Sequence, residues 1–261
     1  MSKPFLIGFV VGLALLLVAG VGASRLHQKD AEQAKLQSEL AEYRAELVDA
    51  TPVQLGVLAD RQRIHSKLYA HYLELTKNFT VSRSVGRAES KVVGIDVHVG
   101  LGPALTEPET PESYFGELAR QSDVVIRGRV ATKASQITED DGFIFTDYGI
   151  LVTEVLKNSN KTRLDSGMTL TVTCPGGKVS VGGIIVKAID HSFALLPQNS
   201  HDLVLFLKYV PETGAFRPTG PAGSFELDGS ILRPLTGVGF PPGVLRDADS
   251  FLQAARAVSD K

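Results

Sequence analysis

The sequence predicts an α+β protein: an N-terminal transmembrane helix, a helical stalk or αα-hairpin, then an antiparallel β-barrel with a C-terminal helix. Three observations lead to this fold class. Residues 5–23 are an uninterrupted apolar run, residues 26–49 contain neither Gly nor Pro, and residues 123–232 hold closely spaced strand patterns separated by turns. The predicted divisions are residues 1–24, 25–80, 81–112 and 113–261.

The apolar run is the first predicted element. At 1.5 Å per helical residue, residues 5–23 reach about 28 Å, close to the thickness of a hydrocarbon core. We therefore expect a signal anchor, so that the chain contacts the membrane through this run. The expected location is the cell membrane, single-pass, with the bulk of the chain outside the cytoplasm. In the alternative, the small residues Val21, Gly22 and Ala23 mark a signal peptide that is cleaved after Ala23, and the protein is secreted.

Composition excludes some partners and some chemistry. The 261 residues carry a formal net charge of −2, whereas nucleic-acid binding calls for a basic face, so we expect no nucleic-acid partner. The single Cys174 cannot form an internal disulfide. It continues the apolar alternation of Leu170 and Val172, which predicts a buried thiol that behaves as a small hydrophobe.

Residues 26–49 are rich in helix-forming residues. Leu36, Leu40, Tyr43 and Leu47 recur at alternating spacings of four and three, which is typical of a coiled-coil seam. The seam covers about two heptads, which is short for an independent coiled coil. Two alternatives stay open: the helix packs within its own chain, or it binds a protein partner or self-associates.

A second helix is expected from Thr51 to about residue 77. Thr51 is a possible N-cap, Pro52 occupies the first helical position, and Gln54 completes a capping box. The spacing of His65, Tyr69 and Tyr72 puts these side chains on one stripe. Residues 87–101 then alternate as a short strand, and residues 102–111 form an acidic, proline-rich linker.

The remainder predicts a short helix over residues 114–120, many strands and a closing helix over residues 244–259. Closely spaced strands without intervening helix patterns indicate an antiparallel barrel or sandwich. The predicted strands cover residues 123–131, 143–156, 168–174, 179–189, 203–210, 215–218 and 224–232.

Four segments carry a resemblance to a known domain. They are residues 122–130 (SDVVIRGRV), 147–157 (DYGILVTEVLK), 175–177 (PGG) and 204–208 (VLFLK). Together they resemble a bacterial extracytoplasmic domain with an OB-like, netrin/TIMP-like β-barrel, over residues 122–235. The resemblance implies an exported barrel with no family-level catalytic residue. The cysteines of true netrin and TIMP domains are missing, so inhibitor activity is not carried over.

The sequence predicts no catalytic residue, no cofactor and no metal. The nucleophile elbow G-x-S-x-G and the zinc motif H-E-x-x-H are absent. The adjacent residues Asp190, His191 and Ser192 have the composition of a triad but cannot line up as one. The acidic stretch at residues 139–142 lacks the spacing of a calcium loop and indicates a solvated hairpin tip.

The resulting functional hypothesis is a membrane-anchored, extracytoplasmic binding or scaffold protein rather than an enzyme. Its candidate binding surface is the turn of Pro175, Gly176, Gly177 and Lys178 with nearby loops. One alternative is a subunit of a membrane protein complex that acts through its helical segment. The other is a hydrolase, for which a pocket would have to join His191 or His201 to a carboxylate and a hydroxyl.

Overall fold

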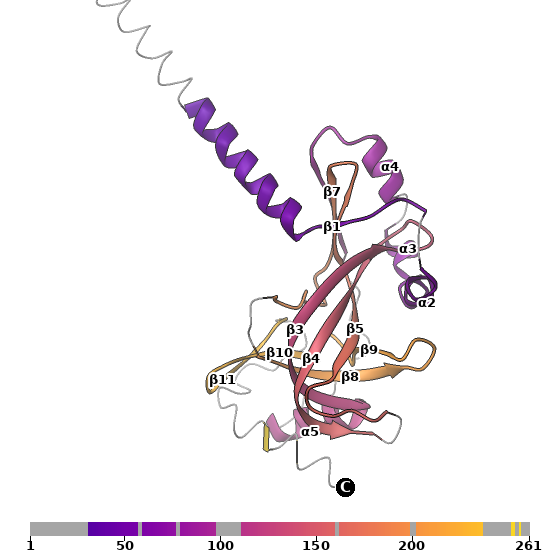
Figure 1. Cartoon of the computed structure of the whole chain (residues 1–261), viewed down its shortest axis with the longest axis vertical. Coiled ribbons are helices and arrows are strands. Elements are labelled where there is room, and N and C mark those ends of the chain that lie inside the picture. Colours follow the sequence, from indigo (N-terminus) through magenta and orange to yellow (C-terminus); the bar gives the residue numbers. More distant parts are fainter. Residues whose placement is uncertain are drawn as a thin grey trace, which may run out of the picture. The chain divides into compact units, whose positions relative to one another are not determined.

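A computed structural model of the chain describes residues 31–56, 59–76, 79–97, 111–159, 162–198 and 202–236, together with residues 252, 253 and 256. The chain divides into two compact units, Met1–Val48 and Asp49–Lys261. Residues 31–49 are helical and are called the N-terminal helix below. All the strands that the structure describes belong to the second unit (Figure 1).

The larger of two sheets has seven strands in the order β11-β10-β8-β3-β4-β5-β9. They are β3 (Val124–Ile137), β4 (Ile144–Asn158), β5 (Thr169–Pro175), β8 (Asp202–Val210), β9 (Ala215–Pro218), β10 (Ser224–Asp228) and β11 (Ile231–Pro234). Neighbouring strands are antiparallel except β5 and β9, which meet in parallel at one residue pair, Val172 with Phe216. β9 also pairs with β8, in antiparallel fashion.

The smaller sheet has four strands in the order β1-β6-β7-β2. They are β1 (Thr51–Pro52), β2 (Val92–Val97), β6 (Gly177–Val181) and β7 (Ile184–Asp190). β6 and β7 form a hairpin whose turn residues, Gly182 and Gly183, have φ angles of 56° and 83°. A tight hairpin turn of this kind requires left-handed backbone at both positions, which glycine adopts at low cost. β1 and β2 pair in parallel with β6 and β7, respectively.

The helices of the second unit are α2 (Asp60–Leu68), α3 (Tyr72–Leu75), α4 (Val81–Gly86) and α5 (Pro111–Gln121). Figure 1 shows α5 at one end of the long strands β3 and β4, and α4 with β7 at the other end. The predicted helix over residues 114–120 is confirmed as α5. Its rings Tyr114 and Phe115 are 1% exposed, and Phe115 packs edge-on against Phe225 of β10.

A separate apolar cluster lies where α2 and α3 meet the two sheets. Phe143, just before β4, and Phe145, within it, stack on Tyr72 and Tyr69, with ring centroids 4.1 and 5.4 Å apart. Val179 of β6 and Val186 of β7 are buried in the same cluster. The short helices therefore cover the junction between the sheets with aromatic side chains.

The predicted fold class, α+β with a transmembrane helix, a helical stalk or hairpin and an antiparallel OB-like β-barrel, is wrong. The described residues are mainly β, and their strands form two sheets. The larger sheet does not close into a barrel, because β5 and β9 share only the pair of Val172 and Phe216. β1 comes from the segment predicted as helical, whereas β2 lies within the strand predicted over residues 87–101, and both add parallel pairings. The closing helix predicted over residues 244–259 lies almost wholly outside the described residues.

The prediction of a single-pass protein of the cell membrane, with a transmembrane helix or signal anchor, is also corrected. Within the residues that the structure describes, none of the helices has both the length and the apolar character needed to cross a bilayer. Residues 5–23, from which the prediction was made, lie outside the described residues.

The helix predicted to begin at Thr51 is wrong for a reason visible in the contacts of that residue. The Thr51 hydroxyl accepts a hydrogen bond from the backbone N–H of Ser135, in β3, at 2.8 Å. Thr51 and Pro52 extend along β6, and the next helix, α2, begins only at Asp60. A long-range contact thus replaces the expected N-cap.

Candidate functional site

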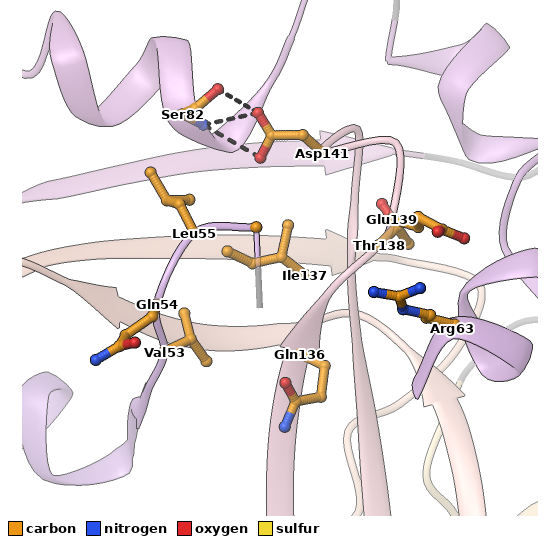
Figure 2. Close-up of a pocket in the computed structure, with 11 residues that line it drawn as sticks. Val53, Gln54, Leu55, Arg63, Ser82, Gln136, Ile137, Thr138, Glu139 and Asp141 are labelled. Atoms are coloured by element: carbon orange, nitrogen blue, oxygen red, sulfur yellow. Dashed lines mark hydrogen bonds between the residues drawn. The ribbon is translucent and has the colours of Figure 1, made fainter. Parts of the chain in front are cut away.

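A cleft of about 320 Å³ opens where two extended segments face one another, one following β1 and one ending β3 (Figure 2). Helices α2 and α4 complete its walls with Arg63 and Ser82. The lining residues are Val53, Gln54, Leu55, Gly56, Arg63, Ser82, Gln136, Ile137, Thr138, Glu139 and Asp141. The cleft combines an apolar centre with a polar rim, which is the usual make-up of a binding site.

The centre of the cleft is apolar. Figure 2 shows Leu55 and Ile137 in the middle of the view, with Gln54 and Gln136 below them. Ile137 is 7% exposed and belongs to the core at the junction of the sheets, whereas Leu55 is 41% exposed. An incoming apolar side chain would therefore contact a fixed surface on the Ile137 side and a more accessible one on the Leu55 side.

One wall of the cleft contains an open sheet edge. β3 pairs with β4 along its length, but on its other side it pairs with β8 only from Val124 to Gly128. Beyond Gly128, this edge of β3 has no strand partner among the described residues. Ser135 directs its N–H to this side, toward Thr51. Because alternate residues of an antiparallel ladder face the same side, Ile137 directs its backbone N–H and C=O into the cleft.

Asp141, at the top of the cleft in Figure 2, is hydrogen-bonded to the start of α4. The Asp141 carboxylate accepts hydrogen bonds from the backbone N–H of Ser82, at 3.1 and 3.3 Å, and from the Ser82 hydroxyl. The Asp141 carbonyl accepts a further bond from the N–H of Val81, at 2.9 Å. Asp141 adopts a φ of 60°, which turns the loop so that these groups meet the first turn of α4. Its charge therefore fixes α4 in place.

Two exposed charges of opposite sign line the cleft, and both lie to the right of Ile137 in Figure 2. Arg63 is the single basic residue among those that line the cleft, and Glu139 stands on the loop after β3. That loop is tied to α2, because the N–H of Glu139 donates to the hydroxyl of Ser66 at 2.6 Å. Arg63 and Ser66 lie on the same helix, so the helix that carries Arg63 is joined to the loop that carries Glu139.

Helix α2 is held in place by a buried imidazole. Nδ1 of His65 donates to the Asp147 carboxylate, lying 2.9 and 3.0 Å from its two oxygens, and Nε2 lies 2.8 Å from the Thr213 hydroxyl. The His65 side chain is fully buried, and that of Asp147 is 12% exposed. Asp147 belongs to β4 and Thr213 to the turn between β8 and β9, so one side chain joins α2 to two parts of the larger sheet.

Carboxylate, imidazole and hydroxyl follow one another here in the order of a nucleophilic triad. The surroundings do not suit catalysis. The Thr213 hydroxyl also accepts from the N–H of Ala215 at 3.4 Å, and the N–H groups of Thr213 and Gly214 both donate to the carbonyl of Val210. These N–H groups are thus unavailable to an oxyanion, and the imidazole is closed to solvent. The arrangement is a fully hydrogen-bonded structural contact.

Two tyrosines extend this anchorage. The Tyr69 hydroxyl is hydrogen-bonded to that of Thr173, in β5, at 3.1 Å. The Tyr72 hydroxyl donates to the carboxylate of Asp190, in β7, which also accepts from the N–H of Ser192. Burial and the contact with the Asp190 carboxylate raise the pKa of Tyr72 far above its usual value, so Tyr72 remains a donor. α2 and α3 are therefore bonded to both sheets.

The chain matches no family model and no curated protein. The resemblance to an extracytoplasmic barrel domain therefore stays a prediction, and it assigns no role to any residue of the cleft.

The predicted binding surface, Pro175 to Lys178, lies at the junction between β5 and β6 rather than at the cleft. Pro175, Gly176 and Gly177 are buried. The N–H of Gly176 donates to the carbonyl of Ile144 at 2.8 Å. A Cβ added to Gly177 would clash with the hydroxyls of Ser135 and Thr146. Whether these residues bind a ligand stays a prediction; their visible contacts join the two sheets.

Lys178 is partly exposed and belongs to an ionic cluster. Its Nζ lies 2.7 Å from the Asp49 carboxylate, which also bonds to Lys133 at 2.6 Å. Burial alone would raise the pKa of Asp49, but the hydrogen bonds from the two lysines outweigh burial and leave that pKa below its usual value. The cluster joins Asp49 to β3 and β6.

The structure describes two of the other residues singled out in the sequence, Cys174 and His191. Cys174 is confirmed as a buried thiol, and burial raises its pKa far above the usual value. His191 Nε2 lies 3.9 Å from the Asp96 carboxylate on the surface, and His201 is outside the described residues. No group of three or more metal-ligating side chains converges within the described ranges. The cleft itself has no sequence motif, because its lining residues come from separate segments whose proximity depends on the fold.

Proposed function

We propose that the protein is a binding module that captures an extended peptide segment of a partner protein in the cleft. The observation that carries the proposal is the open edge of β3, which enters the cleft at Ile137 beside an apolar centre. A peptide strand added to a sheet edge gains main-chain hydrogen bonds from the edge and specificity from alternate side chains.

The backbone of Ile137 is the expected pairing site. A peptide aligned with this end of β3 would satisfy the N–H and C=O that Ile137 directs into the cleft. Its inward side chain would then contact Val53, Leu55 and Ile137, all of which line the cleft. The inward side chain of the ligand is therefore expected to be apolar, while Gln54 and Gln136 contact its polar flanks.

The charges of the cleft specify a second feature of the ligand. The Asp141 carboxylate already accepts hydrogen bonds from Ser82. The exposed charges among the lining residues are then Arg63 and Glu139. Arg63 stands beside the apolar centre, and a guanidinium binds a carboxylate with two parallel hydrogen bonds. We therefore expect an extended peptide with an acidic side chain near its apolar anchor.

Hydrogen bonds hold the elements that form the walls of the cleft. α2 presents Arg63 to the cleft while His65 and Ser66 of the same helix bond to the larger sheet and to the loop after β3. A preformed site loses less conformational entropy when it binds. This supports a binding role for the cleft.

The test selects peptides from a random library on the full-length chain and measures their affinity by fluorescence anisotropy. We expect Arg63→Glu to weaken binding about tenfold or more. Arg61→Glu is the matched control, because Arg61 is an exposed residue of α2 outside the cleft lining. Leu55→Lys is expected to weaken binding, whereas Leu75→Lys, at a similarly exposed leucine of α3, is not.

A second measurement tests the pairing with the sheet edge. Single N-methyl groups are introduced along the selected peptide, and methylation of the amide that pairs with β3 should abolish binding. Peptides that bind Arg63→Glu and Leu55→Lys as tightly as the wild type would overturn the proposal. Failure of the library to yield any specific peptide would overturn it as well.

A further inference from the structure

The N-terminal helix carries an apolar seam that faces solvent. Leu36 is 60% exposed, Leu40 43% and Leu47 37%. Tyr43 lies on the same seam and is half-buried. Exposed leucines at this spacing are unfavourable in water and are typical of a helix that pairs with another.

The heptad positions of the seam follow from its spacing. Leu40 and Leu47 occupy a positions, and Leu36 and Tyr43 occupy d positions. The flanking g positions are then Glu32, Glu39 and Glu46, and the flanking e positions are Gln37 and Arg44. One flank of the seam is therefore uniformly acidic, and the other is neutral or basic.

This asymmetry selects one orientation for a second copy. In an antiparallel pair the g flanks face one another, which would bring the three glutamates of each copy together. In a parallel, in-register pair each g residue faces the e residue five positions later in the other copy. Glu39 then faces Arg44 of the second copy, and Glu32 faces its Gln37. The pairing of Glu39 with Arg44 occurs twice by symmetry.

The contact within one copy that competes with this pairing is weak. Lys35 Nζ lies 3.8 Å from Glu39 Oε1, and both side chains are more than half exposed. An exposed pair of this length contributes little to stability. Glu39 thus keeps the freedom to bind the guanidinium of another copy.

We propose that the N-terminal helix pairs in parallel and in register with the same helix of a second copy of this chain. The leucine seam supplies the apolar contact, and the pairing of Glu39 with Arg44 sets the orientation. The seam spans about two heptads, so the association is expected to be weak and concentration-dependent. This inference does not depend on the peptide-binding role of the cleft and stands if the cleft binds nothing.

Sedimentation equilibrium of the full-length chain tests the association. We expect a reversible dimer whose dissociation constant rises about tenfold or more for Leu40→Glu. Ala41→Glu is the matched control, since it places the same charge on the neighbouring exposed position outside the seam. A protein that is monomeric at every concentration overturns the proposal, as does a dimer that Leu40→Glu leaves unchanged.

Charge exchange tests the partner residues. Glu39→Arg should weaken the dimer about threefold, because two arginines would then face one another in each pair. Combining it with Arg44→Glu restores the opposite charges and should restore the affinity. A double variant that is weaker than Glu39→Arg would contradict the assigned pairing.

Disulfide formation tests the orientation. Gln33→Cys lies at an a position one heptad before Leu40, where parallel, in-register helices bring the two cysteines together. Ser38→Cys, at an f position on the far side of the helix, is the control. In a glutathione redox buffer we expect a covalent dimer for Gln33→Cys alone. Equal crosslinking of both variants, or of neither, would overturn the parallel arrangement.

Discussion

His65 donates from Nδ1 to both oxygens of Asp147, at 2.9 and 3.0 Å, in a contact that joins a short helix to the centre of the larger sheet. The imidazole is fully buried, and its Nε2 is hydrogen-bonded to the Thr213 hydroxyl. We expect His65→Ala to destabilise the fold by about 3 kcal/mol, because the Asp147 carboxylate would remain largely buried without its donor. Urea unfolding measures the change in free energy.

His191→Ala is the control for this substitution. Its ring is 44% exposed and lies 3.9 Å from an exposed carboxylate, so its loss should change stability by no more than about 0.5 kcal/mol. If both variants lose the same free energy, the Asp147 contact does not have the structural role assigned to it.

Gly177 is predicted to tolerate no side chain. Its φ of 151° is one that other residues rarely adopt, and a Cβ would clash with the hydroxyls of Ser135 and Thr146. We expect Gly177→Ala to cost at least about 2 kcal/mol. Gly94→Ala, in a strand where no atom lies within 4 Å of the added Cβ, should be nearly neutral. Thermal unfolding distinguishes the two, and a stable Gly177→Ala would contradict the packing described.

Asp202 is predicted to make stability depend on pH in the acid range. Burial alone would raise the pKa of Asp202, but hydrogen bonds from Arg129 and Arg127 outweigh burial and hold it below its usual value. Since the folded pKa is lower than the unfolded one, about 3.9, the ionised form stabilises the fold above that pH. This contribution disappears as the pH falls through the folded pKa.

The measurement is urea unfolding of the wild type and of Asp202→Asn across this pH range. We expect Asp202→Asn to be less stable at neutral pH, with a difference that shrinks below about pH 4. Asp228→Asn serves as the control. Arg233 Nη2 lies 3.1 Å from Asp228 Oδ2, but both side chains are more than half exposed, and an exposed ion pair contributes little to stability. A difference that grows on acidification would contradict the sign of the shift.

Asp141 is predicted to control the order of α4. Asp141→Gly keeps the positive φ but removes the acceptor for the N–H and hydroxyl of Ser82. We expect a loss of about 1 kcal/mol and faster amide hydrogen exchange across Val81–Gly86. Asp165→Gly, at an exposed loop carboxylate, is the control and should leave exchange in α4 unchanged. Unchanged exchange in Asp141→Gly would show that α4 does not need this cap.

Local patterns in the sequence locate most strands of the larger sheet. The strands predicted over residues 143–156, 168–174 and 203–210 correspond closely to β4, β5 and β8, because apolar alternation reflects burial against a core. β3 continues six residues past the predicted end at residue 131. Its last part, residues 132–137, lies at the open edge and is mostly polar, so the apolar alternation that marks a strand is missing there.

The smaller sheet and the cleft depend on contacts that no local pattern encodes. Residues 179–189 look like one strand, but Gly182 and Gly183 fold them into a hairpin. Thr51 has the sequence pattern of a helix N-cap, but its hydroxyl accepts a hydrogen bond from the backbone N–H of Ser135 instead. The spacing of His65 with Tyr69 and Tyr72 placed them on one stripe, and all three bond to the sheets. Which partners they meet is decided by the tertiary fold.

The pairing of β1 with β6 joins Thr51 to Val179, and that of β2 with β7 joins Val92 to Ile185. During synthesis on a ribosome, the first member of each pair emerges long before its partner has been translated. The nascent chain must therefore carry these early segments unpaired until the β6–β7 hairpin leaves the exit tunnel. Until then the segment after β1 has no strand to align it, so the cleft is assembled only after that hairpin has been made.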